Sequence, residues 1–517
     1  MRIIAVDLSP EQYHDPEAMR RRVAGELGVA CGDIGEVRVT RRILDCRRRN
    51  IVYHTEVAVT MRGETLPDTE RMEPVRPVPA GAPRVVVVGA GPAGLFAALR
   101  CLRHGLKPVI VERGKPVGER KFDIARLARE EVVDPDSNWC FGEGGAGTYS
   151  DGKLYTRSTK RGDVGQVLRV FVAHGADPGI MIDAHAHIGT DRLGPIIAAM
   201  RRTVEEAGGE YLFGQRVDGL LVRDGAAVGV TTRGGLRIEG RAVVLATGHS
   251  ARDVYAMLHG MGIELQAKPF ALGVRVEHPQ ELINRIQYHG ADYSRLLPAA
   301  AYSLTAQASG HGVYSFCMCP GGVIVPAATA QGEQVVNGMS NSRRNSPWAN
   351  SGIAVSVTPA DVGSDDTMAL LDFQRKVERR MCEAAGGGTA APAMRLTDFM
   401  RRRPTSSLRR TGYLGRTIEA PLHELLPPFV ADCLREGFRQ FDRRMHGFIT
   451  DEAAILAVES RTSSPLRIPR SPQTLCHVSV AGLYPCGEGA GYAGGIVSSA
   501  IDGIRCADAI AAWIGQG

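Results

Sequence analysis

The sequence predicts an α/β fold built around a Rossmann-type domain, and three observations support this prediction. Four consecutive valines, at 85–88, lead into the glycine-rich turn GAGPAG. One helix further on, the apolar run KPVIVE ends at Glu112. A second glycine-rich turn, GEGAGYAGG, precedes an apolar helix near the end of the chain, at 487–495. Strand, glycine turn, helix and strand in this order are typical of a parallel sheet that binds a dinucleotide.

Changes of pattern along the chain divide it into five segments. The first reads as strand, helix, strand and strand, which is compatible with a ferredoxin-like module. A Pro-rich stretch follows, and mixed strands and helices fill the region between the two glycine-rich turns. We therefore predict an N-terminal α+β module at 1–75, a linker at 76–83, the first part of the Rossmann-type domain at 84–255, an inserted mixed α+β substrate domain at 256–470, and the C-terminal part of the Rossmann-type domain at 471–517.

Length and composition are those of an ordinary globular protein. The 517 residues suffice for two or three domains. A net charge of +6 is too small to indicate nucleic-acid binding by itself. The chain begins without the regions of a signal peptide, its longest apolar run is too short to cross a bilayer, and eleven cysteines in this length are no disulfide scaffold. We expect a cytoplasmic protein without a membrane partner; the sequence does not indicate an oligomeric state.

The first glycine-rich turn has the features that a dinucleotide requires. Gly89 allows the tight turn, Gly91 lets the main chain approach a diphosphate, and Gly94 allows close packing of the helix on the strand. The helix that follows directs its free N–H groups at the phosphates. Glu112 is placed to accept hydrogen bonds from ribose hydroxyls, and its charge disfavours a 2′-phosphate. Further expected contacts in this unit are Pro92, Ala93 and Arg113.

Two other stretches, at 142–147 and 489–494, also fit the GxGxxG spacing. Neither belongs to a βαβ unit that ends in an acidic residue about 20 residues on, whereas 84–114 does. The first turn is therefore the expected dinucleotide site. The turn alone suits either FAD or NAD.

Two further segments resemble elements of FAD-binding flavoproteins. VVLATGHS, at 243–250, is similar to their ATG element, in which Ala246, Thr247 and Gly248 pass near the adenosine half. YPCGEGAGYAGGIVSSAIDG, at 484–503, is similar to their C-terminal element, in which an acidic residue, here Glu488, accepts from ribityl or diphosphate-side groups. The resemblance implies that the first glycine-rich turn and the C-terminal element together hold one FAD. It implies further contacts at Val217, Gly487, Gly495 and Ile496.

Larger blocks resemble a bacterial and plastid family of uncharacterised FAD-dependent dehydrogenases. The blocks cover 41–59, 141–157, 246–280, 313–327 with 335–340, and 459–470 with 482–496. The resemblance implies FAD and a dehydrogenase reaction but indicates no substrate. One departure is Ala186, where the pattern is expected to have proline.

The middle glycine-rich block, from Gly142 to Lys153, is expected to lie against the flavin. Its glycines permit close approach of the main chain, and Gly147 is an expected contact. Lys153 could neutralise reduced flavin or phosphate. An ordinary surface turn is the alternative interpretation.

Three residues are candidates for catalysis. Cys317 and Cys319 alternate along an expected strand, so both side chains would leave one face, with Cα atoms about 6.5–7 Å apart. A reducible pair there would suit thiol–disulfide exchange, although two buried core residues explain the pattern as well. His249, directly after the ATG element, could act as a general acid or base, or have a structural role. No metal site is predicted, because the pair His185 and His187 has no further ligand at a suitable spacing.

We interpret the chain as an FAD-dependent oxidoreductase, a dehydrogenase that transfers a hydride between a small organic substrate and flavin N5. NAD(P)H is a candidate transient electron donor, and an NAD(P)H-dependent ene-type reductase is one alternative. A tRNA-modifying or RNA-binding flavoprotein is another, because five arginines occur at 41–49. A solvated basic edge explains these arginines better, so nucleic acid is not the expected partner.

Overall fold

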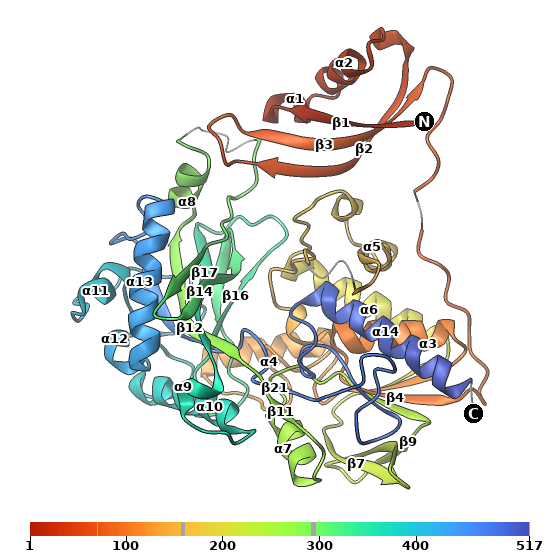
Figure 1. Cartoon of the computed structure of the whole chain (residues 1–517), viewed down its shortest axis with the longest axis vertical. Coiled ribbons are helices and arrows are strands. Elements are labelled where there is room, and N and C mark those ends of the chain that lie inside the picture. Colours follow the sequence, from red (N-terminus) through yellow and green to blue (C-terminus); the bar gives the residue numbers. More distant parts are fainter. Residues whose placement is uncertain (70, 157–160, 291–295, 516–517) are drawn as a thin grey trace.

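The computed structural model describes residues 1–517 except 70, 157–160, 291–295 and 516–517 (Figure 1). A small N-terminal unit lies at one end of the molecule, and the remaining chain is organised around two larger sheets.

The N-terminal unit is a three-stranded antiparallel sheet with two helices. In chain order its elements are β1 (Arg2–Leu8), α1 (Pro10–His14), α2 (Pro16–Leu27), β2 (Ile34–Asp45) and β3 (Val52–Met61). The strand order is β1-β3-β2. Ser9 and Asp15 accept hydrogen bonds from the first turns of α1 and α2 and so begin these helices. With the two short helices taken together, this order matches the first four of the six elements of the ferredoxin-like βαββαβ pattern, and the assignment to that fold stays a prediction.

Five parallel strands form the sheet that carries the first glycine-rich turn, in the order β22-β10-β4-β5-β6. The central strands are rich in buried valine because both faces of the sheet are covered. The edge strand β22 comes from near the end of the chain and pairs with β10. The bounds are β4 (Arg84–Val88), β5 (Lys107–Val111), β6 (Glu210–Leu212), β10 (Ala242–Leu245) and β22 (Leu483–Pro485).

Helices α3 (Pro92–Arg103) and α14 (Ile496–Ile514) lie side by side on this sheet (Figure 1). Small residues allow the approach, since a Cβ atom on Gly503 would lie 2.1 Å from the carbonyl oxygen of Ala93. Arg100 of α3 also pairs with Asp508 of α14, at 2.5 Å. The two glycine-rich turns therefore belong to one structural unit although they lie far apart in the sequence.

Further elements surround the parallel sheet. A small antiparallel sheet comprises β7 (Val217–Arg223), β8 (Ala226–Thr232) and β9 (Arg237–Glu239). The helices are α4 (Val117–Glu130), α5 (Val164–Ala173), α6 (Thr190–Glu206) and α7 (Arg252–Gly260).

The second large sheet has seven strands, in the order β13-β14-β17-β12-β20-β18-β19. All of them lie in sequence between β10 and β22 of the parallel sheet, as an inserted domain would; the domain boundaries stay a prediction. The bounds are β12 (Phe270–Pro279), β13 (Thr305–Ala308), β14 (His311–Cys319), β17 (Trp348–Val357), β18 (Ala391–Arg395), β19 (Thr417–Glu419) and β20 (Ala454–Glu459).

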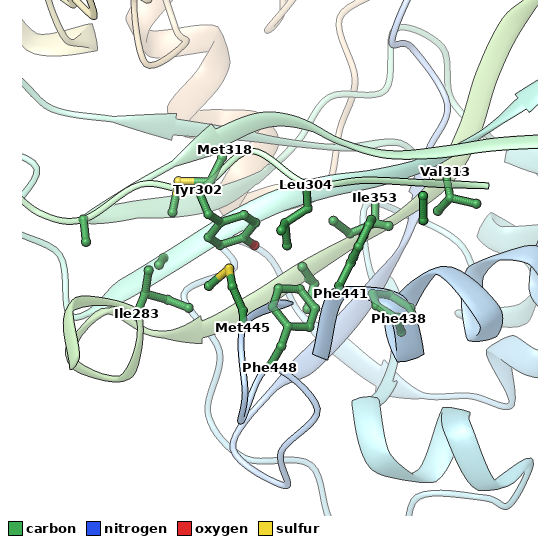
Figure 2. Close-up of a cluster of buried hydrophobic side chains, with 14 of the residues drawn as sticks. Ile283, Tyr302, Leu304, Val313, Met318, Ile353, Phe438, Phe441, Met445 and Phe448 are labelled. Carbon is green, nitrogen blue, oxygen red and sulfur yellow. The ribbon is translucent and has the colours of Figure 1, made fainter. Parts of the chain in front are cut away.

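Helix α13 (Pro428–Arg444) packs on one face of this sheet. Phe438, Phe441 and Phe448 meet Val313 and Ile353 of the strands in a buried cluster (Figure 2). Burial of these aromatic rings stabilises the packing of α13 on the sheet. The remaining elements are β11 (Gln266–Ala267), β15 (Gly322–Pro326), β16 (Val336–Ser340), β21 (Leu466–Arg467), α8 (Gln280–Gln287), α9 (Pro359–Val362), α10 (Ala369–Ala384), α11 (Leu396–Arg401) and α12 (Leu422–Leu425).

The N-terminal unit contacts both larger parts of the molecule. Arg42 of β2 donates its backbone N–H to the carbonyl of Ile182, and its side chain pairs with Asp183 at 2.9 Å. His14 and His289 make hydrogen bonds between this unit and the segment around α8. No helix in the described part of the chain is long and apolar enough to cross a membrane.

Candidate functional site

A cavity of about 340 Å³ lies where the parallel sheet meets the second large sheet. Four glycine-containing segments contribute to its wall: the first turn, the middle block, the ATG element and the C-terminal turn. The structure therefore brings together most of the predicted cofactor contacts. The predicted contacts that line the cavity are Gly89, Gly91, Pro92, Ala93, Glu112, Arg113, Gly147, Lys153, Val217, Ala246, Thr247, Gly248, Glu488, Gly495 and Ile496.

The glycines of the first turn have the conformations that their predicted roles require. Gly89 has a φ of 104°, and a Cβ atom there would lie 2.5 Å from the carbonyl oxygen of Ala246. A Cβ atom on Gly94 would lie 1.9 Å from the carbonyl oxygen of Gly89, so this glycine serves helix packing and does not line the cavity. The Cβ direction of Gly91 meets only one atom, 3.9 Å away. The main chain at Gly91 is thus open to close approach by a ligand.

Glu112 holds two glycine-rich segments together. Its buried carboxylate accepts hydrogen bonds from the backbone N–H groups of Ala90, Gly114 and Gly142, at 2.8–3.0 Å. A carboxylate has about four acceptor positions, so room for a further donor remains. The contact between Glu112 and a ribose stays a prediction.

The middle block is not a surface turn, because Gly142, Glu143 and Gly144 are all buried. The backbone N–H of Gly144 donates to the carbonyl of Ala90 in the first turn, at 2.9 Å. The Glu143 carboxylate accepts from the backbone of Val117 and from Arg201. The block is therefore a fixed second wall of the cavity.

The C-terminal turn is fixed by a buried ion pair behind the cavity. Arg470 donates to both carboxylate oxygens of Asp502, at 3.0 and 2.6 Å. Asp502 also accepts from the backbone N–H of Gly487, at 2.8 Å. Gly487, predicted as a cofactor contact, shapes this turn and does not line the cavity, whereas its neighbours Cys486 and Glu488 do.

His249 and Glu488 lie next to each other in the cavity wall, with His249 Nε2 and Glu488 Oε2 3.6 Å apart. Burial raises the pKa of Glu488 to about 7. Burial, followed by the nearby charges of Arg461 and Arg252, lowers the pKa of His249 to about 4. The imidazole is therefore neutral near pH 7, and the carboxyl group can gain or lose a proton there.

The predicted regular alternation of Cys317 and Cys319 is wrong. The pairing of β14 with β17 shifts between Phe316 and Cys319, and Cys317 has a φ of 43°, so a bulge interrupts the strand. Cys317 is exposed and Cys319 is buried, although both line the cavity, and both are free thiols. Periodicity alone could not reveal this bulge.

Several donors hold the carbonyl groups of this bulge. Arg275, wholly buried, pairs with Glu459 at 2.7 Å and directs Nη1 at the carbonyl of Cys317, 3.4 Å away. The Cys319 thiol donates to the same carbonyl, at 3.2 Å. Lys153, predicted as a cofactor contact, donates to the carbonyl of Met318 while it lines the cavity.

A buried network of two arginines and two glutamates lies beside the ATG element. Arg252 and Arg461 both contact Glu333 and Glu378, with N–O distances of 2.7–3.3 Å. Burial alone would raise the pKa of Glu378, but Arg252 and Arg461 lower it to about 2. Arg461 is therefore committed to protein partners.

Within the described residues, one group of possible metal ligands occurs, formed by Cys486, Asp502 and Cys506. The guanidinium of Arg470 already binds both oxygens of Asp502, so a cation has no vacant carboxylate there. The absence of a metal stays a prediction.

Sequence reasoning missed part of the cavity wall. Phe316, Asn337 and Gly338 reach it from β14 and β16, and Cys140 and Phe141 reach it from the two positions just before the middle block. All of these residues except Cys140 lie within segments that carry the family resemblance. Without the fold, however, nothing in their spacing indicates that they converge.

The residues present fit a dinucleotide cofactor. Gly248 has a φ of 71°, and a Cβ atom built on it would have no atom within 4 Å. The same is true of Gly494 and Gly495. These glycines border the cavity, so a ligand can contact the main chain directly. The N-terminus of α14, at Ile496, also lies at the wall and offers N–H donors to an anionic group.

Comparison with known proteins agrees with this site. Families described as "FAD-dependent protein, C-terminal domain-like", "FAD dependent oxidoreductase" and "FAD binding domain" match residues 269–462, 194–333 and 84–122. A domain of unknown function matches residues 1–60.

Individual relatives were also found. An uncharacterized protein of Clostridium beijerinckii is 37% identical over 528 residues, covering 99% of this chain and 98% of the relative. Protein FixC of Salmonella typhi is 28% identical over 238 residues, which cover 42% of this chain and 48% of FixC. Among solved structures, the flavin-dependent brominase Bmp2 aligns with a TM-score of 0.41 at 14% identity, over 84% of this chain and 80% of the brominase.

Fold, site and family together define a flavoprotein oxidoreductase with FAD as its cofactor. The chain belongs to the family of FAD-dependent oxidoreductases that includes the Clostridium beijerinckii protein.

Proposed function

We propose that this oxidoreductase transfers a hydride between a small organic substrate and FAD in the cavity between the two large sheets. The observation that supports the proposal is the composition of the wall. One part consists of glycine-rich turns suited to the cofactor, and the other consists of side chains from β14 and β16, including Phe316, Cys317 and Asn337. FAD supplies the hydride chemistry at N5, and the protein supplies binding, orientation and charge.

In this proposal the cofactor is held by the two glycine-rich turns, Glu112 and the ATG element. The N-terminus of α14 and Lys153 both border the cavity and add positive charge to it. A helix N-terminus stabilises a nearby negative charge by about 0.3–1 kcal/mol. The two groups together favour the electron-rich form of a bound flavin.

His249 and Glu488 are proposed to move the proton that accompanies the hydride. Their side chains are 3.6 Å apart and both line the cavity. Because the pKa of Glu488 is raised to about 7, this carboxyl group can hold a proton and pass it on at neutral pH. Cys317, exposed at the bulge, is proposed to contact the substrate.

The alternatives differ in the source of electrons and in the partner. An NAD(P)H-dependent ene-type reductase would use the same cavity. An RNA-binding role has weaker support, because Arg41, Arg42 and Arg47 each pair with a carboxylate, at 3.3, 2.9 and 2.6 Å. These pairs offset three of the five arginine charges at 41–49 and so reduce the charge that could contact phosphate.

Anaerobic absorption spectra of the FAD-loaded protein test the proposal. NADH, NADPH, dithiothreitol and a panel of small alcohols, amines and 2-hydroxy acids are added separately. Bleaching of the flavin by an organic substrate, with no need for nicotinamide, is the expected result. Bleaching by NADH or NADPH alone, followed by reoxidation with an activated alkene, would favour the ene-type reductase instead.

A further inference from the structure

Arg120 of α4 is a wholly buried arginine whose hydrogen bonds all go to neutral groups. Its Nε donates to the carbonyl of Asn138, and its Nη1 donates to the carbonyls of Glu143 and Gly145, at 2.8–2.9 Å. Its Nη2 has no hydrogen-bond partner. No ion pair involving Arg120 is found in the described part of the chain.

This arrangement is an exception among the buried arginines that the structure describes. The other four each contact a carboxylate: Arg275 contacts Glu459, Arg435 contacts Asp432, Arg461 contacts Glu378, and Arg470 contacts Asp502. Burying a charge without an opposite charge costs several kcal/mol. Burial lowers the pKa of Arg120, yet a guanidinium keeps its proton at neutral pH.

The side chains of two nearby acidic residues, Glu112 and Glu143, form their hydrogen bonds with groups other than Arg120. Glu112 accepts from three backbone N–H groups, and Glu143 accepts from Val117 and Arg201. Both carboxylates and the ring of Tyr149, whose centroid lies 4.9 Å from the guanidinium carbon, attract the charge of Arg120, but neither carboxylate forms an ion pair with it.

Arg120 lies directly behind the part of the wall where two glycine-rich segments touch. A Cβ atom on Gly145 would lie 3.1 Å from the Cα atom of Gly91. Because the carbonyl of Gly145 points at Arg120, the planar trans peptide turns the N–H of Ala146 the opposite way. Gly91, Gly145 and Ala146 all line the cavity, and α3 begins next to them at Pro92.

We propose that Arg120 is a positioning residue for the cofactor, and that its buried charge, which forms no ion pair within the protein, attracts the diphosphate of FAD. Through the Glu143 and Gly145 carbonyls it holds the middle block so that the N–H of Ala146 faces the cavity. Its charge acts on the diphosphate across this single layer of main chain, together with the N-terminus of α3. The inference rests on FAD as the cofactor and is independent of the substrate and the direction of the reaction.

Displacement of FAD from the full-length holoprotein tests this role. ADP and adenosine are added in excess to the wild type and to Arg120→Met and Arg120→Lys, and the release of FAD is followed by its fluorescence. Adenosine lacks the diphosphate, so the ratio of the two displacing potencies measures how well the site binds that group. Arg201→Met is the matched control, since it loosens the middle block by removing an arginine that already pairs with Glu143.

We expect Arg120→Met to reduce the preference for ADP over adenosine by about tenfold or more, the effect of one lost charge-assisted interaction. Arg120→Lys, which keeps the charge, should stay within about threefold of the wild type, and Arg201→Met within about twofold. An unchanged preference for ADP over adenosine in Arg120→Met would contradict the proposal. Arg120 would then only stabilise the conformation of the middle block. If Arg120→Met does not fold, Arg120→Lys still tests the proposal. Loss of the preference for ADP over adenosine in this variant, which keeps the charge, would contradict the proposal.

Discussion

Gly503 of α14 lies directly on the backbone of Ala93 in α3, with space for a hydrogen atom but not for a methyl group. This contact joins the C-terminal helix to the helix that begins at the first glycine-rich turn. The cavity depends on it, because both helices border the cavity at their N-terminal ends.

Replacing Gly503 with alanine should therefore separate the two helices. The added Cβ would lie 2.1 Å from a backbone oxygen, which cannot move aside as a flexible side chain would. We expect a loss of about 1–3 kcal/mol in the free energy of unfolding, measured by urea titration. Gly25→Ala in α2 is the control: no atom lies within 4 Å there, and alanine should stabilise that helix by about 0.5–1 kcal/mol.

Replacing His249 and replacing Glu488 should change the pH dependence of the free energy of unfolding in opposite directions. The pKa of Glu488 is raised from 4.5 to about 7 on folding, so its contribution to stability falls as the pH rises through this range. The pKa of His249 is lowered from 6.5 to about 4, so its contribution rises with pH between these values. In the wild type the two contributions oppose each other.

Unfolding of the FAD-free protein at several pH values separates the two groups. Relative to the wild type, Glu488→Gln should gain stability between pH 5 and 7, and His249→Gln should lose it between pH 4 and 6.5. Each change should be about 1–3 kcal/mol. Parallel curves for all three proteins would show that neither group is shifted.

The buried network around Glu378 predicts a large effect of one neutral substitution. Glu378→Gln leaves Arg252 and Arg461 with only Glu333 as an acidic partner in the network. We expect a loss of about 3–5 kcal/mol in the free energy of unfolding, because an uncompensated charge stays buried. Glu436→Gln, at an exposed pair with Arg439, should change stability by less than about 1 kcal/mol. Equal effects of the two substitutions would contradict this account of the network.

Cys317 offers a direct probe of what fills the cavity. Cys317 is an exposed residue at the bulge, and Cys31 is an exposed residue in the N-terminal unit. Bound FAD should slow alkylation of Cys317 by N-ethylmaleimide about tenfold or more, because it fills the space beside the thiol, and leave Cys31 unaffected. Peptide mass spectrometry distinguishes the two sites. Equal protection of both, or of neither, would argue that Cys317 does not face the cofactor.

The sequence was sufficient for the parts of the fold that depend on local pattern. The valine run at 85–88, the glycines after it and Glu112 at the end of the next strand lie as their spacing predicts. Ala246 and Glu488, which the resemblance of the two later elements to flavoproteins singled out, line the same cavity, and their contact with a cofactor stays a prediction. Such features are predictable because backbone geometry requires a particular residue type at a fixed position.

The sequence could not predict features that depend on contacts between distant segments. The bulge at Cys317 reflects donors such as Arg275 and Lys153, which come from other parts of the chain. The hydrogen bond from Gly142 to Glu112 and the hydrogen bond from Arg120 to the carbonyl of Glu143 also form only once the middle block has folded. An arginine in an amphipathic helix gives no sign in the sequence that it will be buried.

Both ends of the Rossmann-type unit are proposed to hold one FAD, and the dissociation constant of FAD in variants at each end tests this proposal. Gly91→Val and Gly494→Val introduce side chains at two cavity-lining positions from opposite ends of the unit, and at neither position would the added Cβ atom lie within 3.4 Å of a protein atom. Gly118→Val, in an open position on α4 away from the cavity, is the control. Fluorescence titration should show FAD affinity reduced by about tenfold or more in both cavity variants and unchanged in the control. Wild-type affinity in Gly494→Val would contradict the claim that the C-terminal turn takes part in binding.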